Sequence, residues 1–377
     1  MESELKDLSS PAPAAAPPPR PASAAADKDD RPLLKLEPEP EPEAGAEAPA
    51  ITPENLAELE KRFAAYVRRD AYGSMGRGEL PLGEKLLLGV AMATLVPVRV
   101  VAALAILVAY YLICRACTLL KAPNREEEGE QEDYAHMGGW RRKVIVACGR
   151  VLSRAMLFVM GFYWIDETFR GASGGPEKAG KEQHEEHERP GAIVSNHVSY
   201  VDILYHMSSS FPSFVAKWLN FLWLVSSGVI TERVREAHQN KDAPMMMLFP
   251  EGTTTNGDYL LPFKTGAFLA KAPVLPVILN YPYQRFSPAW DSISGVRHVI
   301  FLLCQFVNHI EVTHLPVYYP SEQEKGDAKL YANNVRRLMA KEGHLILSDI
   351  GLAEKRVYHA ALNGNNSLPS VLHQKED

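Results

Sequence analysis

The chain has 377 residues, of which 46% are hydrophobic, and its formal net charge is −6. This length and composition exclude a wholly disordered chain and allow one large domain with appendages. The negative net charge argues against nucleic-acid binding, because neutralising phosphates requires a concentrated basic surface. The four cysteines are too few for a disulfide framework, which favours thiols in a reducing compartment.

The two ends of the chain are predicted to be unstructured. Residues 1–51 are rich in Pro, Ala and Glu and contain little to bury, so they cannot offset the entropy lost on ordering. Order is expected to begin at Thr52, a good N-cap that precedes Pro53 at the first helical position. Residues 363–377 are a polar tail that we expect to be frayed.

The most apolar stretch, residues 86–120, is interrupted by Pro97 and Arg99. Each half is shorter than the roughly 20 residues that a membrane-spanning helix needs, and the whole is longer than one span. A kinked single span, a hairpin that dips into one leaflet and a buried helix pair of a soluble protein all fit. We favour the membrane forms, so residues 52–121 are predicted to form an N-terminal helix and a membrane segment.

Residues 122–189 are predicted to contain an acidic linker, a helix and a charged loop. Basic residues punctuate the apolar helical segment that ends at Trp164, which suits an anionic membrane surface or a plain solvated helix face. In the charged loop, the run from Gly171 to Gly175 matches the G-x-S-x-G motif of serine hydrolases. No strand precedes it to form a nucleophile elbow, so we reject a hydrolase site.

Residues 190–362 alternate short apolar runs with helical segments, which is typical of an α/β layer fold. We expect a mixed sheet that begins at residue 190, has helices on its faces and is preceded by the apolar membrane-associated helical segment. The predicted strands are residues 191–195, 213–216, 245–249, 274–279 and a run around 310–317, and the predicted helices are residues 199–207, 265–271 and 328–341.

Polar residues follow two of the predicted strands. The first block places His197 five residues before Asp202 on a turn. Histidine can take and return a proton near neutral pH, and a neighbouring carboxylate can orient its ring, so the pair is a candidate general base and its acid. No metal site is predicted, because Cys114 and Cys117 form a C-x-x-C without a second pair.

The second block, residues 250–257, combines Glu251, Gly252 and three threonines at the end of a strand, where α/β folds place ligands. Its amides and hydroxyls could hold a phosphate, with charge supplied by Lys264 and Lys271, two helical turns apart. An ordinary polar turn with solvated lysines is the alternative.

Together the two blocks resemble the glycerolipid acyltransferase superfamily, whose members carry Asn-His-x4-Asp followed by Phe-Pro-Glu-Gly-Thr. Here these motifs stand as Asn196-His197 to Asp202 and as Phe249 to Thr253, and Pro276 matches a third family feature, an apolar strand with a proline. Within the superfamily the chain is most similar to the plant lysophosphatidylethanolamine acyltransferases.

The resemblance implies transfer of an acyl group from acyl-CoA, a co-substrate with no further cofactor, to a lysophospholipid such as lysophosphatidylethanolamine. It implies His197 as general base and Asp202 as the acid that orients it. The residues implied in substrate binding are Asn196, Glu251, Gly252, Thr253 and Lys264. Membrane lipid is an implied partner, and the endoplasmic reticulum is the implied location.

One family motif has no convincing counterpart. Relatives carry a glycine-led strand between the two blocks, whose arginine is taken to contact the acceptor phosphate. The lookalike from Gly228 to Arg233 has its arginine one residue early, and the two blocks lie closer together than in relatives. This spacing indicates a deletion. The alternative function is therefore a catalytically impaired isoform that acts as a membrane-associated interaction protein.

Overall fold

The computed structural model describes residues 53–119, 124–125, 132–133, 139–171, 189–214 and 227–362. The predictions for the two tails, for the acidic linker other than its two short strands and for the run from Gly171 to Gly175 beyond its first residue lie outside these ranges. The helices are α1 (Pro53–Arg62), α2 (Leu82–Thr118), α3 (Gly139–Val159), α4 (Val201–Ser209), α5 (Ser227–Gln239), α6 (Gly295–Cys304), α7 (Glu322–Gly326), α8 (Ala328–Gly343) and α9 (Leu352–Leu362). The strands are β1 (Asn124–Arg125), β2 (Glu132–Asp133), β3 (Asp166–Phe169), β4 (Ala192–Ser195), β5 (Ser213–Phe214), β6 (Met246–Leu248), β7 (Tyr259–Leu260), β8 (Val274–Asn280), β9 (Glu311–His314) and β10 (Ile346–Leu347).

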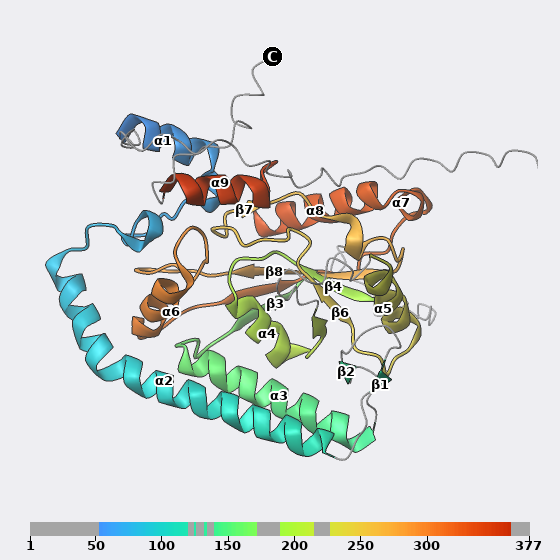
Figure 1. Cartoon of the computed structure of the whole chain (residues 1–377). Helices are drawn as coiled ribbons and strands as arrows, with labels where there is room; N and C mark the ends of the chain where they lie inside the picture. The colour runs from blue at the N-terminus through green and yellow to red at the C-terminus, as the bar shows by residue number, and fades with distance from the viewer. Residues whose placement is uncertain are drawn as a thin grey trace, which may run out of the picture. The chain divides into compact units, whose positions relative to one another are not determined.

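Six strands form one mixed sheet in the order β3-β9-β8-β4-β6-β5. Figure 1 labels β3, β8, β4 and β6 of this sheet. Strands β8, β4, β6 and β5 run parallel to one another, whereas β9 is antiparallel to β8 and parallel to β3. All four residues of β4 are buried, as expected for a parallel strand with helices on both faces. The carboxyl ends of β4, β6 and β8 therefore meet at one edge of the sheet.

The alternation of side chains along the central strands divides the core into two layers. Ile193 packs with residues of α3, α4 and α6 on one face of the sheet. Val194 packs with residues of α5 and α8 on the other face. A third, smaller cluster joins the residues that follow α1 to α9, around Phe63 and Tyr358. The layered α/β sheet that the sequence predicts is confirmed.

Three sequence expectations about this sheet and its helices are wrong. Strand β3 ends two residues before Gly171, so the expectation that no strand precedes the run from Gly171 to Gly175 is wrong. The sheet does not begin at residue 190, because β3 pairs with β9 at its edge; all four residues of β3 are exposed, so no apolar run announced this strand. Residues 265–271 do not form a helix but a 3-10 turn, Thr265–Ala267. The left-handed backbone of Lys271, with φ of 58°, is incompatible with a continued helix.

Helix α2 runs without interruption through Pro97, so the hairpin and the helix pair, both of which require a break there, are wrong. Proline removes one backbone hydrogen bond, which a long helix can tolerate with a bend. Among the described residues, α2 is the one helix long and apolar enough to cross a membrane. Arg99 on α2 is buried and donates to the carbonyl oxygens of Leu303 at 2.8 Å and of Phe306 at 3.2 Å, at the end of α6.

Candidate active site

His197 lies on the loop that links β4 to α4, with its side chain 19% exposed. Its Nδ1 is 2.8 Å from Asp202 Oδ2. Because the carboxylate can only accept, this geometry favours the tautomer in which Nδ1–H donates and Nε2 keeps its lone pair. The ring of Phe249 stacks on the imidazole at a centroid distance of 4.1 Å and restricts its rotation. The predicted base and acid therefore meet in a geometry suited to proton transfer at Nε2.

Asp202 is fully buried on the first turn of α4. Its Oδ2 also accepts from the backbone N–H groups of Val198 at 2.7 Å and Ser199 at 2.9 Å, and the Tyr281 hydroxyl donates to Oδ1. Burial lowers the pKa of the neighbouring His206 to about 3, so this second histidine stays neutral. His206 therefore adds no charge beside Asp202, and His197 is the histidine whose ring bonds to this carboxylate.

Glu251 begins the turn after β6 and is 3% exposed. Its Oε1 accepts from the backbone N–H of His197 at 2.7 Å, and its Oε2 accepts from that of Leu261 at 2.9 Å. Thr255 N–H in turn donates to the His197 carbonyl oxygen at 3.0 Å. Burial raises the pKa of Glu251 to about 8, although the two N–H donors act in the opposite direction. The N–H and the carbonyl oxygen of His197 are thus both bonded to the second block.

Gly252 and Thr253 form the more accessible part of the same turn, and Lys264, which follows β7, lies beside them. Gly252 is exposed and has φ of 72°, a conformation that favours glycine. A Cβ at this position would lie 2.7 Å from Lys264 Nζ, so the ammonium group lies directly over the glycine. Thr253 is half-buried beside them. A main-chain turn and a cation are therefore brought together beside Glu251, whose carboxylate bonds to the His197 backbone.

Asn196 is 2% exposed, and both polar atoms of its side chain bond to the backbone of Leu279: Nδ2 donates to the carbonyl oxygen at 2.9 Å, and Oδ1 accepts from the N–H at 2.8 Å. These contacts join the end of β4 to β8, which lies beside it. Asn196 thereby fixes where the His197 loop leaves the sheet.

Two other predicted contributors lie elsewhere. Lys271 lies just before β8 begins, at the amino edge of the sheet, where it lines a pocket with Arg235 and Tyr319. It is therefore not paired with Lys264 across one helix face. The run from Gly228 to Arg233 belongs to α5, so it is not the glycine-led strand of the missing motif.

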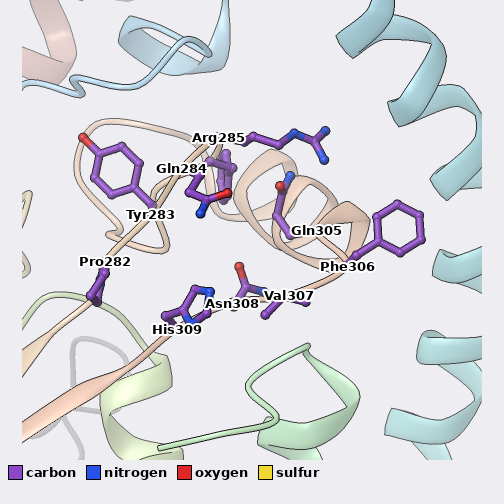
Figure 2. A pocket seen from close by; sticks show the side chains of 10 residues that line it. Pro282, Tyr283, Gln284, Arg285, Gln305, Phe306, Val307, Asn308 and His309 are labelled. Carbon is purple, nitrogen blue, oxygen red and sulfur yellow. The ribbon is translucent and has the colours of Figure 1, made fainter. Parts of the chain in front are cut away.

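A pocket of about 190 Å³ opens between the loop after β8 and the loop that joins α6 to β9. Figure 2 shows Tyr283 and Arg285 on the first loop and Phe306 and His309 on the second. Arg285 also forms an ion pair with Glu84 at the start of α2. None of the predicted site residues lines this pocket. Within the described ranges, no group of three His, Cys, Asp or Glu side chains could hold a metal ion.

Sequence reasoning missed Tyr281, which donates to Asp202, and Lys355 of α9, which donates to Thr254 of the second block. Tyr281 directly follows β8, so it could have been found only if the neighbouring positions of β8 and β4 in the sheet were known. Lys355 lies in a helical stretch that resembles any amphipathic helix. Its sequence context carries no signal for this contact.

Comparison with known proteins identifies the relatives of the chain. Residues 225–280 match the family model described as Acyltransferase. The chain is 58% identical over 365 residues to lysophospholipid acyltransferase LPEAT1 of Arabidopsis thaliana, with 85% of this chain and 92% of that protein covered. It is 35% identical over 228 residues to lysophosphatidylcholine acyltransferase of Drosophila melanogaster, with 54% and 40% covered. It is 31% identical over 279 residues to lysophosphatidylcholine acyltransferase 1 of Danio rerio, with 68% and 50% covered. The chain thus spans half or less of the length of these two animal relatives. No solved structure matches the chain.

The raised pKa of Glu251 leads to a pH prediction. A carboxyl whose folded pKa of about 8 exceeds its ordinary value of 4.5 contributes stability that is complete below pH 4.5 and is lost as the pH rises through 8. Glu251→Gln cannot titrate. The difference in Tm between the wild type and this variant, measured by thermal unfolding in detergent, should shrink from about pH 5 to about pH 8. A difference that stays constant over this range would contradict the assignment.

Proposed function

Because the chain belongs to the lysophospholipid acyltransferases, we propose that it transfers a fatty acyl group from acyl-CoA to the free glycerol hydroxyl of a lysophospholipid, with lysophosphatidylethanolamine as the acceptor. The identity with LPEAT1 over most of both chains supports the reaction class. The observation that carries the mechanism is the His197 imidazole, which is bonded to buried Asp202 and held through its backbone by Glu251 and Thr255.

In the proposed step, the Nε2 lone pair of His197 takes the proton of the acceptor hydroxyl while the hydroxyl oxygen attacks the thioester carbonyl carbon. The carbon–sulfur bond then breaks, and the departing CoA sulfur takes the proton back from the imidazolium. General-base catalysis of this kind contributes about 10²- to 10⁴-fold. Asp202 stabilises the imidazolium, and no covalent acyl-enzyme is required.

The accessible groups of the second motif suit the glycerol-phosphate of the acceptor. Lys264 would supply the charge, and the turn at Gly252 and Thr253 would supply amide and hydroxyl donors. Asn196 and Glu251 would act indirectly, because the backbone already occupies their polar atoms. Lys264 would also take over part of the role of the arginine in the missing motif.

We propose that this reaction takes place at a membrane, that of the endoplasmic reticulum, and exposed apolar side chains support the proposal. Helix α2 lies along α3 in Figure 1, and large apolar side chains from both helices, from α6 and from nearby loops remain exposed. They include Leu86, Val101, Leu104, Leu107, Leu112, Trp140, Val151, Phe158, Trp164, Val296 and Phe306. Many large exposed apolar side chains on neighbouring helices favour a membrane or partner surface.

The contacts of α2 favour a helix that lies along the membrane surface over one that crosses it. Near its start Glu84 pairs with Arg285, and in its middle Arg99 bonds to the end of α6. At its end Arg141 of α3 donates to the carbonyl oxygens of Cys117 at 3.3 Å and Leu119 at 3.0 Å. A helix bonded to one domain at both ends cannot place those ends on opposite sides of a bilayer.

The reaction is tested with purified chain in phosphatidylcholine vesicles that contain lysophosphatidylethanolamine and acyl-CoA. We expect formation of phosphatidylethanolamine by the wild type and a loss of at least about 100-fold in His197→Ala, since the variant lacks the base. Product that does not exceed that of His197→Ala would reject the active-enzyme proposal and favour the impaired isoform that acts through interactions.

Lys264→Met tests the proposed phosphate contact. Removing a cation that binds the acceptor should raise the KM for the lysophospholipid about tenfold while kcat changes little, as for the loss of uniform binding. Lys271→Met is the matched control, because it removes the same charge at the opposite edge of the sheet. Equal KM values for the two variants would remove Lys264 from the acceptor site.

The orientation of α2 is tested by labelling single cysteines placed at Gly83 and Leu119 in a variant without the four native cysteines. In sealed microsomes, a membrane-impermeant maleimide should give the same result at both positions. Either both are labelled in intact microsomes, or both are labelled only after the membrane is opened. Labelling of one position alone in intact microsomes would show that α2 crosses the bilayer.

A further inference from the structure

Lys355 of α9 joins two loops that lie behind the catalytic histidine. It is only 9% exposed, and its Nζ donates to the Thr254 carbonyl oxygen at 2.7 Å and to Thr254 Oγ1 at 2.8 Å. The same ammonium donates to the Trp290 carbonyl oxygen at 3.3 Å. Thr254 follows β6 and Trp290 follows β8, so the buried cation bonds both loops. The Thr254 hydroxyl also joins them directly, because it donates to the Trp290 carbonyl oxygen at 2.5 Å.

Each of these two loops also bonds to the loop that carries His197, close to its own contact with Lys355. Thr255 N–H donates to the His197 carbonyl oxygen at 3.0 Å, and Trp290 N–H donates to that of Val198 at 2.8 Å. The positions of the two loops therefore set the backbone position of His197. A shift of either loop would move Nε2 relative to the bound hydroxyl.

Helix α9 is itself anchored on the residues that follow α1. Tyr358 packs on Phe63 at a ring centroid distance of 5.4 Å, and the Tyr66 hydroxyl donates to the Gly351 carbonyl oxygen at 2.6 Å. Lys355 Nζ also lies 5.4 Å from the centroid of the Tyr66 ring, a cation–π contact. Segments from the two ends of the described chain thus pack together and support the loops after β6 and β8.

Desolvating an ammonium group is costly, so a buried lysine needs partners that compensate for lost water. Burial lowers the pKa of Lys355 to about 8, which reflects this cost. A methionine of similar length would fill the same volume without the cost. The lysine at position 355 is therefore explained by the hydrogen bonds that its ammonium group donates, and filling the space would not require it.

We propose that Lys355 is a positioning residue for acyl transfer: it fixes the loops after β6 and β8 on either side of the His197 backbone. The C-terminal helix, which lies outside the two sequence motifs, would then control the geometry of the base. This inference rests on the proposed function for its effect on rate, whereas its effect on the loops is independent of the reaction.

Two readouts test the role of Lys355 with the full chain. In the vesicle assay, Lys355→Met should lower kcat about tenfold with KM values for acyl-CoA and lysophospholipid within about twofold of the wild type, because misplacing a base affects the chemical step. Lys355→Arg, which keeps the charge and donors, should recover part of this loss. Arg356→Met removes an exposed cation from the same helix and is the matched control.

Amide hydrogen exchange in detergent provides the second readout. Lys355→Met should speed exchange at residues 197–199 and 253–257 and leave α8 unchanged. Thr254→Val should produce the same pattern, because it removes one Lys355 contact and the direct bond from Thr254 to Trp290. Exchange equal to that of Arg356→Met, or faster exchange throughout the chain, would overturn the proposal. If the wild type forms no product, the proposed function fails, while the exchange pattern still decides whether Lys355 orders the loops.

Discussion

The arrangement of the site depends on the buried carboxylate of Asp202. It accepts from the His197 ring, from the amides of Val198 and Ser199 and from the Tyr281 hydroxyl. A carboxylate removed from water costs several kcal/mol unless its oxygens are bonded, so the segments that carry these donors are fixed relative to one another. These bonds orient the imidazole, because Asp202 Oδ2 accepts both from the His197 ring and from the amides of Val198 and Ser199 in the same loop.

The order of the strands brings the other parts of the site to this carboxylate. Strands β6 and β8 flank β4, so the loops that follow all three strands leave the same edge of the sheet. The β6 loop holds the His197 backbone through Glu251, and the β8 loop supplies Tyr281. Four residues after Tyr281, Arg285 pairs with Glu84, so the same loop is joined to α2. The proposed membrane helix and the proposed base are therefore linked through one short segment.

The sequence predicted those parts of the molecule that leave a local pattern. Strands β4, β6 and β8 are apolar runs because helices cover both faces, and His197 and Asp202 are recognisable because one turn separates them. Strand β3 was missed because its residues are exposed, and Tyr281 was missed because it lies 79 residues from Asp202. The motif also could not show in which direction Asn196 and Glu251 point. Their predicted role in substrate binding stays a prediction, and their hydrogen bonds to Leu279, His197 and Leu261 favour an indirect one.

The tautomer of His197 tests the proposed base most directly. Nitrogen NMR of the chain labelled with ¹⁵N-histidine, compared with the spectrum of His197→Ala, isolates the two ring nitrogens of this residue. We expect a proton on Nδ1, donated to Asp202, and an unprotonated Nε2 in the resting protein at neutral pH. A proton on Nε2 in the neutral ring would contradict the proposal, because the nitrogen assigned to the acceptor hydroxyl would then have no lone pair to accept its proton.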